Sequence, residues 1–440
     1  MTAWTGKLCF RLPHSSVLGS YRMAVSILSL WLLLAVLVPC FGGPVTPPTE
    51  TSNTSRTPAI QGAPPFFNNQ KFALSLYTQL PKSKLGKNVI FSPLSITMPL
   101  VLLAFQDKPE ARRQVLQGLG FGVTGALDAK AAVQYGKLLS ALLPAEHCGI
   151  HTGSLFFIDK TLKPQTTFLT LANSSYSSDV ILISFGNHKL AKKQIDLAIK
   201  VKTQGKVTRL LRNLKPPTHL FLTNYNLFKG KWKYRFNPKY TGMRNFSLSN
   251  GTNILVPMMQ KIGWFQLKYF SHIHSYVLQL PFTCNISGVF FLPNDGDLKE
   301  CEKALLEQSF NTWIQPFPLR KRWLFFPKFS IPVALQLESF KHVNSSLKLF
   351  NKRMDLSGIT LQKAPLRVTM AVHRAELAVS EDGEGEDVSN SRVNPEPGLA
   401  ALHFNRSFLL LILDEASKSL LFMGRVLNPT RVITDAVHRP

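Results

Sequence analysis

An unbroken globular pattern is the feature that most limits how this chain can fold. No obvious linker interrupts it from Phe66 to an acidic stretch at 376–398. Apolar residues at helical spacing predict helices at 69–79, 95–105, 112–119, 129–142 and 189–209. Strands are predicted at 153–158, 218–228, 325–331, 407–413 and 419–427, with two more inside 277–292 around Pro281. Helices first and strands afterwards, without an internal repeat, predict an α+β fold.

The N-terminus has the composition of a secretory signal. Basic residues precede an apolar run at 24–38, and small residues follow it at Gly42 and Gly43. The run is short for a membrane span, so we expect a signal peptide; a retained anchor and an internal start at Met23 are the alternatives. The predicted organisation is a signal peptide at 1–42, a Pro/Thr/Ser-rich leader at 43–65, a globular domain at 66–430 and a tail at 431–440. A secreted protein without membrane attachment follows from this organisation.

Seven Asn-x-Ser/Thr motifs behind a signal peptide favour a glycoprotein. The candidate glycosylation sites are Asn53, Asn173, Asn245, Asn250, Asn285 and Asn344. The seventh, Asn405, sits between two apolar runs, and we expect it to be buried and unmodified.

Five cysteines are present, and two of them fall in the predicted signal. The remaining three, Cys148, Cys284 and Cys301, allow one disulfide or none, and the sequence does not choose the pair. No Cys/His spacing typical of a metal site occurs, so neither a metal nor another cofactor is expected.

The charge is strongly positive, with 51 Lys and Arg against 25 Asp and Glu. Such a surface attracts heparin-like polyanions or acidic proteins, although a solvated basic face without a partner is the alternative. Candidate polyanion contacts on and after the predicted basic helix are Lys192, Lys193, Lys200, Arg209 and Arg212. The predicted secretion and the lack of a recognition module disfavour a nucleic-acid role.

Eight short segments occur in an order that is more specific than any one of them. They are NVIFSPLSI at 88–96, LFFIDKTLKP at 155–164, AKKQIDLAIKVKTQGKV at 191–207, TNYNLFKGKWKYRFNPKYT at 223–241, VPMM at 256–259, DLSGIT at 355–360, LHFNRSFLLLI at 402–412 and LFMGRVLNPT at 421–430. In this order, over 66–430, they resemble the serpin superfamily, in particular its α1-antitrypsin-like branch (clade A).

The resemblance implies a serpin fold: three β-sheets, about nine helices and an exposed reactive-centre loop, in a monomer. In inhibitory members a protease cleaves this loop, which then inserts as a new strand into the central sheet. Ser92, Asn224 and His373 match the family's shutter cluster beneath that sheet, and Trp232 matches the breach, where the sheet opens. We therefore expect His373 to be a hydrogen-bonded core histidine and not a catalytic one.

The start of the loop departs from the inhibitory pattern. Glu381 and Gly383 match the family's hinge, but the next inward positions would be Glu384 and Glu386, where inhibitory members carry small neutral residues. Burying an unpaired carboxylate is very costly. Gly385 adds backbone entropy against a strand. We therefore expect no fast insertion.

The rest of the loop contains Pro395 and Pro397, which cannot donate to a strand ladder. The candidate bait region is Arg392, Asn394 and Glu396, of which Arg392 is the basic residue that a protease could recognise. An acidic loop that is only a solvated tether is a further interpretation.

The predicted function is that of a secreted serpin-like glycoprotein without protease-trapping activity, similar in basic charge to uterine serpins. It would act by binding a polyanion, an acidic protein or a small lipophilic ligand. The alternative is a serine-type endopeptidase inhibitor with a bait residue near Arg392, whose partner would be an extracellular serine protease. An enzyme is not expected, because GxSxG, HExxH and phosphate-binding glycine motifs are all missing.

Overall fold

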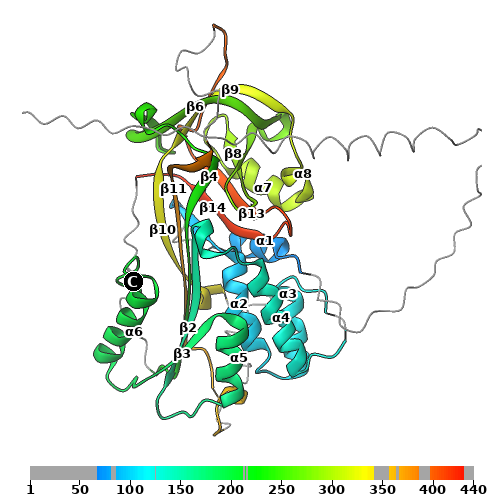
Figure 1. Ribbon diagram of the computed structural model, residues 1–440, viewed down its shortest axis with the longest axis vertical. Helices are drawn as coiled ribbons and strands as arrows, with labels where there is room; N and C mark the ends of the chain where they lie inside the picture. The colour runs from blue at the N-terminus through cyan, green and yellow to red at the C-terminus, as the bar shows by residue number, and fades with distance from the viewer. Residues whose placement is uncertain are drawn as a thin grey trace, which may run out of the picture. The chain divides into compact units, whose positions relative to one another are not determined.

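Two hydrogen-bonded β-sheets organise the domain in the computed structural model (Figure 1). The structure describes residues 67–80, 86–123, 125–211, 214, 217–340, 356–362, 366–385 and 397–430. The α-helices in this part of the chain are α1 (Gln70–Thr78), α2 (Pro93–Ala104), α3 (Pro109–Gly118), α4 (Ala129–Leu142), α5 (Thr166–Tyr176), α6 (His188–Lys202), α7 (Lys299–Glu307) and α8 (Asn311–Ile314). The predicted α+β serpin fold is confirmed, with eight α-helices in the described residues where about nine were expected.

A five-stranded sheet runs through the centre of the domain in the order β10-β11-β4-β2-β3. Its strands are β2 (Ile150–Asp159), β3 (Ser178–Ile183), β4 (Leu220–Tyr234), β10 (Phe329–Gln336) and β11 (Met370–Gly385). The first nine residues of β4 are all buried, which is typical of a strand covered on both faces, and burial then alternates toward its end. The strand β11 lies between β10, which is antiparallel to it, and β4, which is parallel.

Helices cover both faces of this sheet (Figure 1). Helix α6 packs Ala191, Ile195 and Ile199 on one face, in a small cluster that includes Phe221 of β4 and Val372 of β11. The other face belongs to the main core, which contains α2, and all twelve residues of α2 are buried. Thus α2 can place polar side chains directly beneath the central sheet.

The second sheet has nine strands, in the order β1-β14-β13-β8-β7-β6-β9-β12, with β5 paired to β6. They are β1 (Val89–Phe91), β5 (Gly242–Ser247), β6 (Asn253–Phe270), β7 (Ser275–Pro281), β8 (Ile286–Pro293), β9 (Leu319–Pro327), β12 (Ala401–His403), β13 (Phe408–Asp414) and β14 (Leu420–Val426). The 18-residue strand β6 pairs with β5 along its first part, with β9 along its middle and with β7 along its last part. Through β6, two of the three expected sheets form one continuous hydrogen-bonded sheet.

Two boundaries differ from the sequence predictions. The basic helix expected at 189–209 ends at Lys202, because Gln204 and Gly205 adopt left-handed backbone conformations and the Gly205 amide bonds back to the Lys200 carbonyl. The single strand expected at 325–331 is two strands in different sheets, since the chain leaves β9 and enters β10 on either side of Lys328. Among the described helices, none is long and apolar enough to cross a bilayer.

Candidate functional site

A buried polar cluster joins α2 to the central sheet and contains Ser92, Asn224 and His373. The Ser92 amide donates to His373 Nε2 at 2.9 Å, and the Ser92 hydroxyl caps α2 by accepting from the Ser95 amide. Asn224 Nδ2 donates to Ser95 Oγ, and Asn226 Nδ2 donates to Ser92 Oγ, both at 2.8 Å. The three residues expected to form the shutter therefore share one network with two residues that were not predicted, Ser95 and Asn226.

His373 is completely enclosed in this cluster. Its burial lowers the pKa to about 3, so the imidazole is neutral at physiological pH. Because Nε2 accepts a hydrogen bond from Ser92, the proton of the neutral ring belongs on Nδ1. This Nδ1 atom has no hydrogen-bond partner among the described residues. His373 thus accepts a hydrogen bond from the Ser92 amide beneath the sheet while shielded from solvent, and its part in a shutter stays a prediction.

The side chain of Trp232 connects the C-terminal end of β4 to two neighbouring segments. The side chain is 2 % exposed and stacks on Phe282, with ring centroids 4.2 Å apart and planes inclined by 11°. Its indole Nε1 donates to the Ser380 carbonyl of β11 at 2.8 Å. Trp232 thus contacts both the end of β11 and the β7–β8 connection, and its role at a breach stays a prediction.

Glu381, expected at the hinge, is a buried carboxylate with two donors. Lys328 Nζ lies 2.8 Å from Glu381 Oε2, and the Thr241 hydroxyl donates to Oε1 at 2.8 Å. Burial alone would raise the pKa of Glu381, but these hydrogen bonds and the charge of Lys328 outweigh it and hold the pKa below its usual value. The ion pair connects β11 to the residue between β9 and β10.

Two glycines follow Glu381 because the backbone leaves no space for a side chain. A Cβ on Gly383 would lie 2.6 Å from the Trp232 carbonyl oxygen and 2.8 Å from Arg235 Cα. A Cβ on Gly385 would lie 2.9 Å from the Lys233 carbonyl oxygen. Between these glycines Glu384 is exposed to solvent. The hinge residue Glu386 and the bait residues Arg392, Asn394 and Glu396 lie outside the described residues.

The central sheet is closed along its whole length. The ladder between β11 and β4 runs from Met370 beside Phe221 to Gly385 beside Tyr234, with a register shift between Val379 and Gly383. Since β10 occupies the other side of β11, a loop that continued from β11 and folded back into the sheet would have to break one of these two ladders.

The three cysteines that the structure describes form one bridge, between Cys148 before β2 and Cys284 in the β7–β8 connection. Their Cα atoms are 5.8 Å apart, and the third thiol, Cys301, is buried and unpaired. Burial raises the pKa of Cys301 to about 11, which makes it a poor nucleophile. His147 also lies beside the bridge, but both sulfur atoms are in the disulfide and cannot act as the thiolates a metal needs.

The sequons with described positions are accessible. Asn173, Asn245, Asn250 and Asn285 are exposed, on α5, on β5 and in two turns, while Asn53 and Asn344 lie outside the described residues. Asn405, which we expected to be buried, is partly exposed and lies between β12 and β13.

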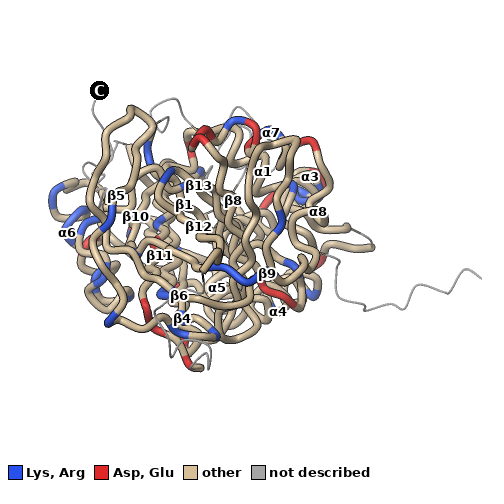
Figure 2. The backbone as a smooth tube through the Cα atoms, turned by 90° about the horizontal axis from the view of Figure 1, so that it is seen from above, with Lys and Arg blue, Asp and Glu red and all other residues tan. Residues whose placement is uncertain are grey.

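The predicted polyanion contacts lie on and just after α6, where Figure 2 shows a group of basic residues. Lys193 and Lys200 are exposed and seven residues apart, which places them on one side of the helix. Lys192 is ion-paired with Asp196 at 2.9 Å, so its charge is partly compensated. Arg209 is exposed beyond the helix end, and Arg212 lies outside the described residues.

Sequence reasoning missed several residues that the structure brings into these sites. Asn226 could have been found, because it lies two residues after Asn224 on the same face of one strand. Lys328 could not, since the sequence holds no sign of its contact with Glu381, 53 residues away.

The sequence matches the serpin (serine protease inhibitor) family over residues 67–429, and the chain belongs to this family. Its relatives place it in the antitrypsin-like branch. The alpha-1-antiproteinase of Rattus norvegicus is 33% identical over 414 residues, which cover 93% of this chain and 100% of the relative. Alpha-1-antitrypsin 1-5 of Mus musculus is 34% identical over 401 residues, covering 90% and 96% of the two chains.

Similar solved structures carry two different descriptions. Human thyroxine-binding globulin, complexed with thyroxine, is 30% identical with a TM-score of 0.71, covering 82% of this chain and 98% of its own. Mouse protein-Z dependent protease inhibitor is 28% identical with a TM-score of 0.71, covering 82% and 97%. Family membership alone therefore does not choose between ligand binding and protease inhibition.

Proposed function

We propose that this serpin is a secreted glycoprotein that binds an extracellular partner and does not trap proteases. The observation that carries the proposal is the charge at the hinge. Glu384 is hydrated in the closed sheet, and insertion would carry it, followed by Glu386, into a buried position. A buried charge without a partner typically costs about 3–5 kcal/mol, which opposes a reaction that must outrun hydrolysis of the protease intermediate.

The accessible sequons and one similar solved structure support the other parts of the proposal. The exposed sequons agree with a secreted glycoprotein, and thyroxine-binding globulin supplies a similar structure described as a ligand complex.

A panel of trypsin-like and elastase-like proteases tests the proposal. We expect cleavage near Arg392 without an SDS-stable complex, and a cleaved form that unfolds at the temperature of the intact protein, because the loop stays out of the sheet. An inhibitory antitrypsin run in parallel provides the positive control, and Arg392→Ala should abolish trypsin cleavage at this position. An SDS-stable complex, or a large thermal stabilisation after cleavage, would establish the alternative function as an inhibitor with its bait near Arg392.

The partner that best matches the surface is a heparin-like polyanion on α6. Lys189, Lys193 and Lys200 are exposed there, and Arg209 follows the helix. A polyanion would neutralise the positive charges of these residues. An acidic protein, which is also negatively charged, is the competing candidate partner. No enzymatic step is involved, because the site offers charge and no activated nucleophile.

Retention on a heparin column tests this partner. Changing Lys189, Lys193 and Lys200 to Gln should lower the salt concentration needed for elution, because exposed charges act through screened electrostatics. The matched control changes Lys130, Lys137 and Lys303, which are exposed on α4 and α7, and it removes the same net charge. Equal elution of the two triple variants would show that only the total charge matters and that α6 is not a site.

A further inference from the structure

A cavity of about 570 Å³ opens beside the upper end of β4, and no part of the proposed function uses it. Five aromatic side chains contribute to its walls: Trp232, Tyr234, Phe236, Trp264 and Phe265. Cavities of roughly 300–1,000 Å³ lined by aromatic side chains and a few polar groups are typical of small-molecule sites. The size and the lining therefore fit a ligand of low molecular weight.

Large apolar side chains converge at the rim of this cavity. Trp264 is 64%, Leu319 59% and Tyr234 45% exposed, and all three line it. A single exposed apolar residue is ordinary, but a group of them around one opening is typical of a binding surface. The apolar part of a ligand would cover these side chains.

Two lysines contribute positive charge to the cavity. Lys261 is only 7% exposed, and its Nζ donates to the Tyr234 carbonyl at 3.1 Å and lies 5.4 and 5.7 Å from the ring centroids of Tyr234 and Phe236. Lys233 also lines the cavity. Among the described lining residues the single acid is Glu415, which is ion-paired with Lys418. An anionic group on the ligand would thus be attracted and a cationic one repelled.

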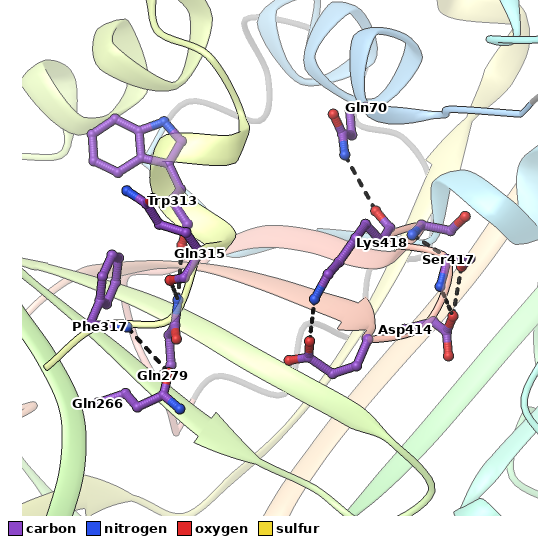
Figure 3. A network of polar contacts seen from close by, with 11 residues as sticks. Gln70, Gln266, Gln279, Trp313, Gln315, Phe317, Asp414, Ser417 and Lys418 are labelled. Carbon is purple, nitrogen blue, oxygen red and sulfur yellow. Dashed lines mark hydrogen bonds and ion pairs between the residues drawn. The ribbon is translucent and has the colours of Figure 1, made fainter. Parts of the chain in front are cut away.

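Two glutamines that line the cavity are held by hydrogen bonds, which Figure 3 shows. Gln279 Nε2 donates to the carbonyls of Gln315 at 2.9 Å and Trp313 at 3.2 Å. Gln266 Oε1 accepts from the Phe317 amide at 3.4 Å, so the amide N–H groups are the donors that Gln266 can offer a ligand. These bonds hold both side chains in place before any ligand arrives, which lowers the entropic cost of binding.

We propose that this cavity binds a small amphipathic organic anion, an apolar body that carries one carboxylate or sulfonate. The aromatic walls and rim would hold the body, while Lys261, Lys233 and Gln266 would face the anionic group. A sulfated polysaccharide does not fit, since it lacks the apolar body. This site is separate from α6 and does not depend on whether the loop traps proteases.

Calorimetric titration of the full secreted chain with decanoate, 1-decanol and 8-anilinonaphthalene-1-sulfonate tests the site. We expect saturable binding of one decanoate per chain, at least about tenfold tighter than 1-decanol because the charge is attracted. Comparing decanoate with the aromatic sulfonate distinguishes an aliphatic from an aromatic ligand, and either result supports the site. Failure of both anions to saturate, or equal affinity for decanoate and 1-decanol, would overturn the proposal.

Two variants locate the binding. Leu319→Glu places a carboxylate at the rim and should weaken the tighter-binding anion by about tenfold or more. The matched control is Leu255→Glu, on β6 outside the cavity, because Leu255 and Leu319 are both 59% exposed on strands and tolerate a charge equally. Lys261→Met should bring the affinities for decanoate and 1-decanol together. Equal loss of affinity in Leu319→Glu and Leu255→Glu would contradict the placement.

Discussion

Replacing both Cys148 and Cys284 with serine should lower the free energy of unfolding by about 4 kcal/mol. The bridge closes a chain segment with a sequence separation of 136 residues, so its loss restores a large loop entropy to the unfolded chain. The bridge also connects the chain before β2 to the β7–β8 connection, which no other covalent bond does. Equilibrium unfolding in urea, with and without dithiothreitol, measures the effect.

Cys301→Ser provides the control for this disulfide prediction. Cys301 is buried beside Ser275 at 3.0 Å and is not bridged, so the variant should keep its sensitivity to dithiothreitol, whereas the double variant should lose it. The unfolded mature chain should show one free thiol. A titre of three thiols, or a double variant as stable as the oxidised wild type, would show that the bridge does not form.

Acidification should destabilise the protein through His373 by about 3 kcal/mol between pH 7 and pH 4. The folded pKa of about 3 lies below the ordinary value of 6.5, so the unfolded chain binds a proton that the folded chain excludes. The contribution is therefore fully present above pH 6.5 and is lost as the pH falls toward 3. Urea unfolding at a series of pH values measures the slope.

The variant His373→Gln separates the contribution of His373 to the pH dependence of stability from the contributions of other titrating groups. The glutamine oxygen can accept a hydrogen bond from the Ser92 amide but does not titrate, so the variant should lose a constant amount of stability. Its stability difference between pH 7 and pH 4 should be smaller than that of the wild type by about 3 kcal/mol. Carboxylates such as Glu381, whose pKa is also lowered, contribute equally to both proteins. A dependence of stability on pH in His373→Gln equal to that of the wild type would refute the assignment.

Much of the fold could be predicted because the sequence patterns are local. The helix expected at 129–142 coincides with α4, and the two apolar runs near the C-terminus are β13 and β14. The spacing of apolar residues predicted the wrong end for α6. The left-handed backbone conformation at Gln204 ends this helix earlier than that spacing suggests. It also could not separate β9 from β10, since the residues on both sides of Lys328 are apolar.

The candidate sites were less predictable because they depend on contacts between distant segments. The resemblance identified Ser92 and His373, which are 281 residues apart, but spacing alone could not have joined them. The partner of Cys148 and the cavity beside Trp232 have no local signature. The lining of that cavity comes from residues between Trp232 and Glu415, each unremarkable in its own segment.

The end of β11 has a further consequence for how these molecules behave at high concentration. Its last residues alternate glycine with acid, and the acids Asp382 and Glu384 are exposed. Charged side chains near an open strand edge disfavour edge-to-edge pairing between separate molecules. If the loop cannot enter its own sheet, the same carboxylates keep it out of a neighbour's sheet. On the proposed function, the same charges that oppose insertion would also protect the protein from strand-mediated polymerisation.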